Sequence, residues 1–254
     1  MRRVEATRYV TPLREGGSLP ALIEADDDGL YVLKFRGAGQ GPKALVAELL
    51  AGEIGRALGL PIPEIVFIDL DPILGRAEAD PEIKALIEAS GGLNLGLDFL
   101  PGSLALDHLT AMKLEPGFGA RVVWFDALVT NVDRSARNTN MLMWHREPWL
   151  IDHGASLYFH HDWPTARPES PFPAIAKHVL LPRAASIGDV SGELASRLPP
   201  ELLHRIVSLV PDDWLQGDAS PDEIRQRYVD YLTRRLAARD TFVEEADRAR
   251  QDFV

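Results

Sequence analysis

The sequence predicts an α+β protein with two lobes, a β-rich first part over residues 1–100 and a mainly helical second part over residues 101–254. Short apolar runs separated by turn residues dominate the first part, whereas apolar residues at helical spacing dominate the second. A chain of 254 residues is also long enough for two lobes, since domains commonly contain about 100 to 200 residues. We therefore expect a ligand site in a cleft between the lobes.

The first part is expected to contain strands with inserted helices. A hairpin is predicted over residues 19–35, because two apolar runs flank the turn sequence ADDDG. A helix follows from about Pro42 to Leu58, where Gly59 is a typical stop signal. The remaining predicted elements are a strand at 64–71, a short helix opened by Asp80 and Pro81, and a strand at 92–103 that runs into a connector.

The second part is expected to be helical, and its last helix has the clearest start. Ser220, Pro221 and Glu223 fit a capping box with a proline in the first turn, and apolar residues at helical spacing follow. An earlier helix, which begins near Ala120, must stop at 130–131, because the sequence NVDRSARNTN is dense in residues that favour turns.

Composition indicates an ordinary globular protein, with 46% hydrophobic and 26% charged residues. No apolar run approaches the roughly 20 residues that span a bilayer, and the first residues lack the apolar segment of a secretory signal, so we expect a cytoplasmic protein without a membrane partner. A net charge of -11 argues against direct nucleic-acid binding. The absence of cysteine restricts any catalysis to oxygen and nitrogen groups.

A glycine-rich octapeptide, RGAGQGPK, follows the apolar run YVLKF at residues 36–43. The third glycine of the dinucleotide-binding fingerprint is replaced by Pro42, which has no N–H to offer a pyrophosphate. The segment also fails as a P-loop, because Pro42 precedes Lys43 and Ala44 follows it. We therefore interpret it as a flexible connection, and a dinucleotide-dependent oxidoreductase is nearly excluded.

Three polar residues in the second part have the spacing of a phosphoryl-transfer site. Asp133 and Asn138 lie in the loop between a helix and a predicted hairpin, and Asp152 directly follows the last apolar strand of that hairpin. Magnesium prefers oxygen ligands of this kind, and phosphoryl transfer needs a carboxylate that orients the incoming hydroxyl. The catalytic Asp and the metal-binding Asn of protein kinases are also five positions apart. Lys34 in YVLKF stands where a phosphate-binding lysine is required, in an apolar run before a helix.

The motifs YVLKF, ELLAGEIGRALGLPIPE, GLNLGLDFLPG, FDALVTNVDRSARNTN and LIDHG occur in this order over residues 31–154. In this combination the chain resembles the HipA-like kinase family, a bacterial branch of the protein kinase-like superfamily that is related to the phosphoinositide kinases. The resemblance implies a bilobal protein kinase-like fold, the cofactors ATP and Mg²⁺, and transfer of the γ-phosphate to a hydroxyl acceptor. The expected acceptor is a protein Ser or Thr, and the alternatives are a small-molecule kinase and a nucleotide-binding pseudokinase with a regulatory role.

The resemblance also implies roles for individual residues. Lys34 would bind the α and β phosphates, and Asp133 would orient or deprotonate the acceptor, so these two are the expected catalytic residues. Asn138 and Asp152 would hold magnesium and thereby the nucleotide. The family's catalytic loop often has a histidine two positions after the Asp, where this chain has Ser135, and this departure leaves the acceptor open.

The helix partner of Lys34 is expected to be Glu48, which lies eleven residues before Gly59 as in the family pattern. Glu53 remains an alternative, because it falls nearer the apolar stripe of the same helix. We favour Glu48, since a lysine partner can project toward the edge of the cleft.

The other expected nucleotide contacts are made by the backbone. The phosphate-covering loop is expected in REGGSLP at 14–20, with Gly16, Gly17 and Ser18 as its candidates. The adenine is expected on main-chain groups of the connector between the lobes, at Asp98, Phe99 and Leu100.

Overall fold

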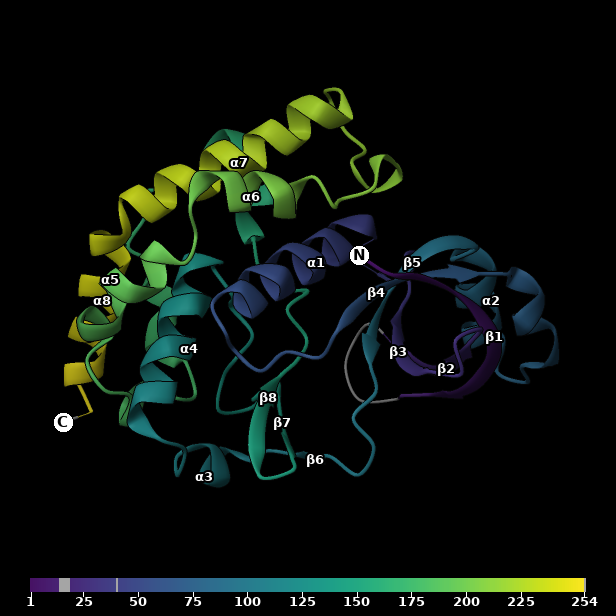
Figure 1. The fold of residues 1–254 in the computed structure, drawn as a ribbon, viewed down its shortest axis with the longest axis horizontal. Coiled ribbons are helices and arrows are strands. Elements are labelled where there is room, and N and C mark those ends of the chain that lie inside the picture. The colour runs from purple at the N-terminus through teal and green to yellow at the C-terminus, as the bar shows by residue number, and fades with distance from the viewer. Residues whose placement is uncertain (14–18, 40, 254) are drawn as a thin grey trace.

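The structure is a computed structural model that describes residues 1–13, 19–39 and 41–253. Figure 1 shows a ring of strands on one side of the molecule and a body of helices on the other, with one long helix between them. The strands come almost entirely from the first part of the chain and the helices mainly from the second, which confirms the predicted α+β class.

The strands of the first part close into a barrel. Their order around it is β1 (Arg3–Pro12), β2 (Ala21–Ala25), β3 (Leu30–Lys34), β5 (Gly92–Asp98) and β4 (Ile65–Leu70). Neighbouring strands are antiparallel except that β4 pairs in parallel with β1, and this pairing closes the ring. The predicted strands are present, but their closure into a barrel was not foreseen.

A glycine in β5 is needed for the close approach of two barrel strands. A Cβ at Gly96 would collide with Cδ1 of Ile68, which comes from the neighbouring strand β4. The absence of a side chain at Gly96 therefore makes room for Ile68 in the barrel interior.

Two further elements cover the barrel, and one long helix leads away from it. The 3₁₀ helix η1 (Pro72–Ala77) and helix α2 (Pro81–Ala89) connect β4 with β5, and Ile83 and Ile87 of α2 join the apolar cluster of the barrel. Helix α1 (Pro42–Ala57) connects β3 with β4. As predicted, it begins at Pro42.

The second part of the chain starts with a small antiparallel sheet. This sheet contains β6 (Leu104–Ala105), β7 (Met141–Trp144) and β8 (Glu147–Leu150), and the last two form the predicted hairpin. The α-helices of this part are α3 (His108–Ala111), α4 (Pro116–Leu128), α5 (Ile187–Ser196), α6 (Pro200–Val207), α7 (Pro221–Ala237) and α8 (Arg239–Gln251). Short 3₁₀ helices are η2 (Tyr158–His161), η3 (Trp163–Thr165), η4 (Pro173–Lys177), η5 (Leu181–Arg183) and η6 (Asp212–Trp214).

The predicted start of the last helix is confirmed, and the helical tail is divided into two helices. Ser220 and Glu223 form a capping box at the start of α7. The helix then ends at Ala237, and α8 begins two residues later. This break directs α8 along α4, where Phe242 packs edge-on against Trp124 with 5.8 Å between the ring centroids. Over the described ranges, no helix is both long and apolar enough to cross a membrane.

The buried apolar residues form two clusters, and helix α1 belongs to the larger one. The smaller cluster fills the barrel and includes Ile23, Leu33 and Val66. The larger cluster joins Leu49 and Ile54 of α1 to the helices of the second part. By packing, α1 is therefore attached to the helical body, although it lies within residues 1–100.

Candidate active site

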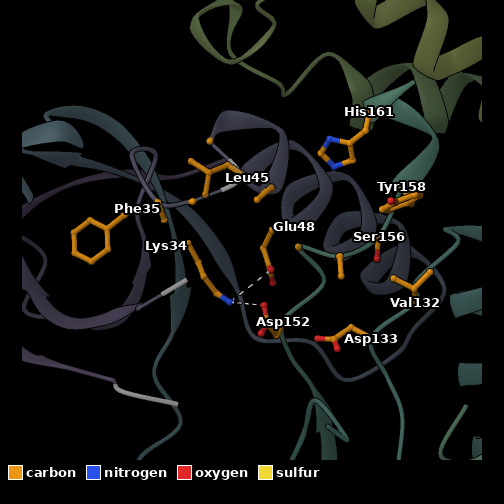
Figure 2. A pocket seen from close by; sticks show the side chains of 16 residues that line it. Lys34, Phe35, Leu45, Glu48, Val132, Asp133, Asp152, Ser156, Tyr158 and His161 are labelled. Atoms are coloured by element: carbon orange, nitrogen blue, oxygen red, sulfur yellow. Dashed lines mark hydrogen bonds and ion pairs between the residues drawn. The ribbon is translucent and has the colours of Figure 1, made fainter. Parts of the chain in front are cut away.

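Lys34 at the end of β3 lies between two carboxylates that come from distant parts of the chain. Its Nζ is 2.7 Å from Asp152 Oδ1 and 3.8 Å from Glu48 Oε2 of α1. Figure 2 shows the lysine side chain extending toward both acids. Glu53 does not take this place, since its carboxylate accepts a hydrogen bond from Arg56 on the outer side of α1. The structure thus places Glu48 beside Lys34.

The two ionic groups of β3 and α1 stabilise each other's charge. Burial by itself disfavours the charged form of each, yet the side chains of Glu48 and Asp152 leave the pKa of Lys34 above its ordinary value. Burial likewise raises the pKa of Glu48, but the Lys34 charge and a hydrogen bond from His153 outweigh it and bring this pKa well below its usual range. Lys34 and Glu48 are therefore both charged in the folded protein.

Asp133 is held by amides of its own loop. The side chains of Asn138 and Asn140 both donate to Asp133 Oδ2, at 2.8 and 3.0 Å. The backbone N–H of Asp133 donates to Asn131 Oδ1 at 3.0 Å. The carbonyl of Asn140 in turn accepts from the N–H of Ile151, the residue before Asp152. Asn140 therefore connects the loop of Asp133 to the segment after β8 that carries Asp152.

A buried ionic network fixes this loop from behind. Asp126 near the end of α4 is fully buried, and its Oδ2 accepts from Arg134 Nε at 2.6 Å and from His178 Nε2 at 2.8 Å. Its Oδ1 accepts from Asn131 Nδ2 at 2.9 Å. Arg134 also donates to the carbonyl of Asn140. Burial raises the pKa of Asp126, but the charge of Arg134 and the bond from His178 lower it far below the ordinary value.

Asp152 has an unusual backbone conformation for a residue other than glycine. Its φ is 55°, in the left-handed region that Asp and Asn adopt more readily than most residues. The next residue, His153, is completely buried, and its Nδ1 lies 3.4 Å from Glu48 Oε1. The turn thus directs Asp152 to Lys34 and His153 to Glu48.

The acids and the lysine share one cavity of about 350 Å³. Among the expected site residues, Lys34, Glu48, Asp133 and Asp152 line it. Figure 2 shows Asp133 and Asp152 at one end of this cavity, with Tyr158 and His161 farther along the segment after Asp152. Asn138 and the connector residues 98–100 are not among the lining residues.

The connector residues that are expected to contact the adenine make backbone hydrogen bonds of their own. The N–H of Asp98 donates to the carbonyl of Glu64 at 2.8 Å, just before β4, and the N–H of Phe99 donates to the carbonyl of Leu30 in β3 at 2.9 Å. Leu100 is buried, and its carbonyl accepts from the N–H of Ser103 at 3.2 Å. Because the N–H groups of Asp98 and Phe99 already have partners, an adenine bound at the connector would contact other main-chain groups.

The proposed phosphate-covering loop cannot be placed. Gly16, Gly17 and Ser18 lie outside the described residues. The octapeptide at 36–43 is described except for position 40 and connects β3 to α1, as expected from the sequence. Its Gly39 and Gly41 line the cavity.

The oxygen donors present fit a magnesium ion that is shared with a nucleotide. Within the described ranges, no three His, Asp or Glu side chains gather into a metal cluster. Magnesium seldom needs such a cluster, because it is usually bound by one or two carboxylates together with water and substrate phosphates. Asp152 supplies a carboxylate at the cavity, and Asn138 has its amide nitrogen turned to Asp133, which leaves its oxygen as the donor for a metal.

The comparison with protein families decides the assignment. A family model described as HipA-like kinase matches residues 7–246. The chain belongs to the HipA-like kinase family. This membership confirms the predicted family and the predicted enzyme class, an ATP-dependent kinase.

Solved structures of two kinases share the fold of this HipA-like kinase. The Helicobacter pylori proinflammatory kinase CtkA is 12% identical, with a TM-score of 0.54 and 99% of each chain covered. A Golgi casein kinase with Mn/ADP bound is 14% identical, with a TM-score of 0.50 over 96% of this chain and 73% of that one. No curated protein matches the chain.

Two residues of the site were missed by the sequence reasoning, Asn140 and His153. Asn140 is one of several polar residues in NVDRSARNTN, and nothing in its spacing distinguishes it from its neighbours. His153 stands directly after the proposed metal-binding Asp152, and this adjacency was the available signal.

Proposed function

We propose that this HipA-like kinase transfers the γ-phosphate of ATP to a hydroxyl group with the help of Mg²⁺, in a site between an N-terminal lobe (1–100) and a C-terminal lobe (101–254). One observation carries the proposal. Lys34, Glu48, Asp133 and Asp152 come from four separate segments and line the same cavity. Charged residues rarely share a cavity without a functional reason, because their burial is costly.

Lys34 is proposed to bind the α and β phosphates. Its ammonium group pairs with Asp152 Oδ1 at 2.7 Å. On nucleotide binding the phosphates take the place of Asp152 as the negative partner of Lys34. Glu48 stays beside the lysine and holds it in position.

Asp152 and Asn138 are proposed to hold the metal. When bound, magnesium would supply positive charge against the phosphate oxygens, including the charge that develops as the γ-phosphoryl group moves. The left-handed backbone at Asp152 presents its carboxylate at the cavity, where the phosphates are expected.

Asp133 is proposed to orient the acceptor hydroxyl and to receive its proton. Among the described residues, the two side-chain amides that bind Asp133 both donate to its Oδ2. Its Oδ1 is therefore the oxygen that can accept a hydrogen bond from the substrate hydroxyl. The hydroxyl oxygen forms a bond to the γ-phosphorus, the bond from that phosphorus to the bridging oxygen breaks, and ADP leaves. The proton of the hydroxyl passes to Asp133.

A protein Ser or Thr is the proposed acceptor. The Golgi casein kinase is named for a protein acceptor and was solved with Mn/ADP, which agrees with a protein substrate, a nucleotide and a divalent cation for this fold.

Labelled ATP tests the proposal and the acceptor class together. The protein is incubated with γ-labelled ATP, Mg²⁺ and cell extract, and protein and small-molecule fractions are separated. Label in protein that depends on Asp133 supports the proposed acceptor, and label only in small molecules contradicts it. Magnesium-dependent ATP binding without any labelled product would instead favour a pseudokinase.

A further inference from the structure

We propose that His153 is a positioning residue that keeps Glu48 beside Lys34 while Asp152 is engaged by the metal. This inference rests on the proposed function, because it assigns roles within the same site. His153 follows Asp152 in the chain and contacts Glu48, whereas Asp152 contacts Lys34.

The dipeptide of Asp152 and His153 contacts both members of the ion pair. Asp152 Oδ1 lies 2.7 Å from the ammonium group of Lys34. His153 Nδ1 lies 3.4 Å from Glu48 Oε1, and its backbone N–H adds to the stabilisation of the same carboxylate. One turn of the chain therefore holds the lysine with one residue and the glutamate with the next.

In the proposed reaction, the contact of Asp152 with Lys34 is broken, whereas the contact of His153 with Glu48 is retained. The contact between Lys34 and Asp152 must be given up when phosphates and metal bind. The contact between Lys34 and Glu48, at 3.8 Å, is longer than the contact between His153 and Glu48, at 3.4 Å, and its lysine must also serve the phosphates. The hydrogen bond from His153 does not involve the cavity ligands and can persist. His153 is therefore the group that fixes Glu48 when Asp152 turns to the metal.

The surroundings of the His153 imidazole are largely apolar, and its polar contact among the described residues is the one between Nδ1 and Glu48. His153 packs edge-on against Phe125, with 5.8 Å between the ring centroids, so an apolar ring would suit the space. Its Nε2 is buried and has no hydrogen-bond partner among the described residues. An unsatisfied buried nitrogen costs stability, and the site retains it because Nδ1 of the same ring serves Glu48.

A double-mutant cycle measures whether His153 acts through Glu48. The variants are His153→Phe, Glu48→Gln and the two combined, and the measurement is the dissociation constant of Mg-ATP by calorimetry with the thermal midpoint of unfolding. We expect His153→Phe to weaken Mg-ATP binding about tenfold, the effect of one hydrogen bond to a charged group. The thermal midpoint should change little, because the bond lost at Glu48 is offset by removal of the unpartnered Nε2. In the Glu48→Gln background, His153→Phe should have no further effect.

Two control variants distinguish the positioning of Glu48 by His153 from a general effect of side-chain packing. His153→Asn keeps an amide nitrogen near the place of Nδ1 and should restore most of the affinity. His160→Phe removes another buried imidazole, which contacts Tyr228 at 2.9 Å instead of Glu48, and should lower stability without changing Mg-ATP affinity. Equal, additive losses from His153→Phe in both backgrounds would overturn the inference.

A spectroscopic readout without nucleotide distinguishes this inference from the proposed function. The protein is labelled with ¹⁵N at its histidines and measured by NMR. The signal of His153 is identified as the one that is absent from the spectrum of His153→Phe. Glu48→Gln should shift this signal, even if the wild-type protein binds no Mg-ATP and the proposed function fails. An unchanged His153 signal in Glu48→Gln would overturn the contact, whatever the activity.

Discussion

The ammonium group of Lys34 lies closer to Asp152, at 2.7 Å, than to its helix partner Glu48, at 3.8 Å. A lysine that serves phosphates must be able to exchange this close contact for the nucleotide. Under the proposed function, Asp152 would exchange its contact with Lys34 for the metal, and the phosphates would then become the negative partner of the lysine.

Replacing this lysine is expected to affect both binding and stability. Lys34→Met leaves Glu48 and Asp152 without their shared counter-charge, and removal of one partner from a buried ion pair costs about 3 kcal/mol. Urea unfolding should show this loss, and Mg-ATP binding should be lost with it. Lys113→Met, at an exposed position, is the control and should change neither. Tight Mg-ATP binding by Lys34→Met would contradict the assigned role.

The charge of Glu48 predicts a dependence of stability on pH. Its pKa is lower in the folded protein than the ordinary value of 4.5, because Lys34 and His153 outweigh the effect of burial. A group of this kind stabilises the fold above its unfolded pKa, and the contribution is lost as pH falls through the lower, folded value. The folded pKa is about 2, so the thermal midpoint of the wild type should drop between about pH 5 and pH 2.

Glu48→Gln removes this group, so its thermal midpoint should fall less steeply with acid than that of the wild type. Part of the fall should remain, because the pKa of Asp126 is lowered as well. Glu53→Gln is the matched control on the same helix, where the carboxylate pairs with Arg56. Identical acid profiles for Glu48→Gln and the wild type would refute the charged pair.

The network behind the loop of Asp133 should be essential for stability. Asp126→Ala removes the carboxylate that accepts from Arg134 and His178 and leaves a buried guanidinium without its counter-charge. We expect the free energy of unfolding to fall by about 3–5 kcal/mol in chemical denaturation. Glu169→Ala, which breaks an exposed pair with Arg234, should cost under about 1 kcal/mol. Similar losses from the two variants would show that the network is not the anchor we describe.

Arg235 of α7 is expected to stabilise the helix that leads to the catalytic loop. This fully buried guanidinium donates to the carbonyls of Ala127 and Leu128 at the end of α4, and to those of Pro168 and Ser170. Arg235→Met leaves several buried carbonyls unpaired, and each costs about 1–3 kcal/mol. Chemical denaturation should therefore show a loss of about 3 kcal/mol or more. A loss below about 1 kcal/mol would mean that water replaces the arginine.

Much of the site was predictable because its residues are fixed by local spacing. Lys34 stands at the end of an apolar run, Asp152 follows another, and Asp133 lies in a loop dense in turn formers. Such signals need only a few neighbouring residues. The preference for Glu48 over Glu53 also agrees with the observed contacts, since Glu48 points across to Lys34 while Glu53 pairs with Arg56.

The remaining features depend on contacts between distant segments. The barrel closes through pairing of β1 with β4, whose residues are more than sixty positions apart, and no local pattern encodes that register. For the same reason, the sequence did not show that backbone bonds occupy the N–H groups of Asp98 and Phe99. The contact of His153 with Glu48 likewise depends on how α1 packs against the segment after β8.

The most direct test of the account separates nucleotide binding from phosphoryl transfer in two isosteric variants. Asp152→Asn keeps a residue that tolerates the left-handed backbone but removes the metal-binding charge, and Asp133→Asn removes the base. Mg-ATP affinity by calorimetry and label transfer from γ-labelled ATP are measured for both. The account predicts that Asp152→Asn loses magnesium-dependent binding, whereas Asp133→Asn binds Mg-ATP like the wild type and transfers no phosphate. Wild-type transfer by Asp133→Asn would contradict it.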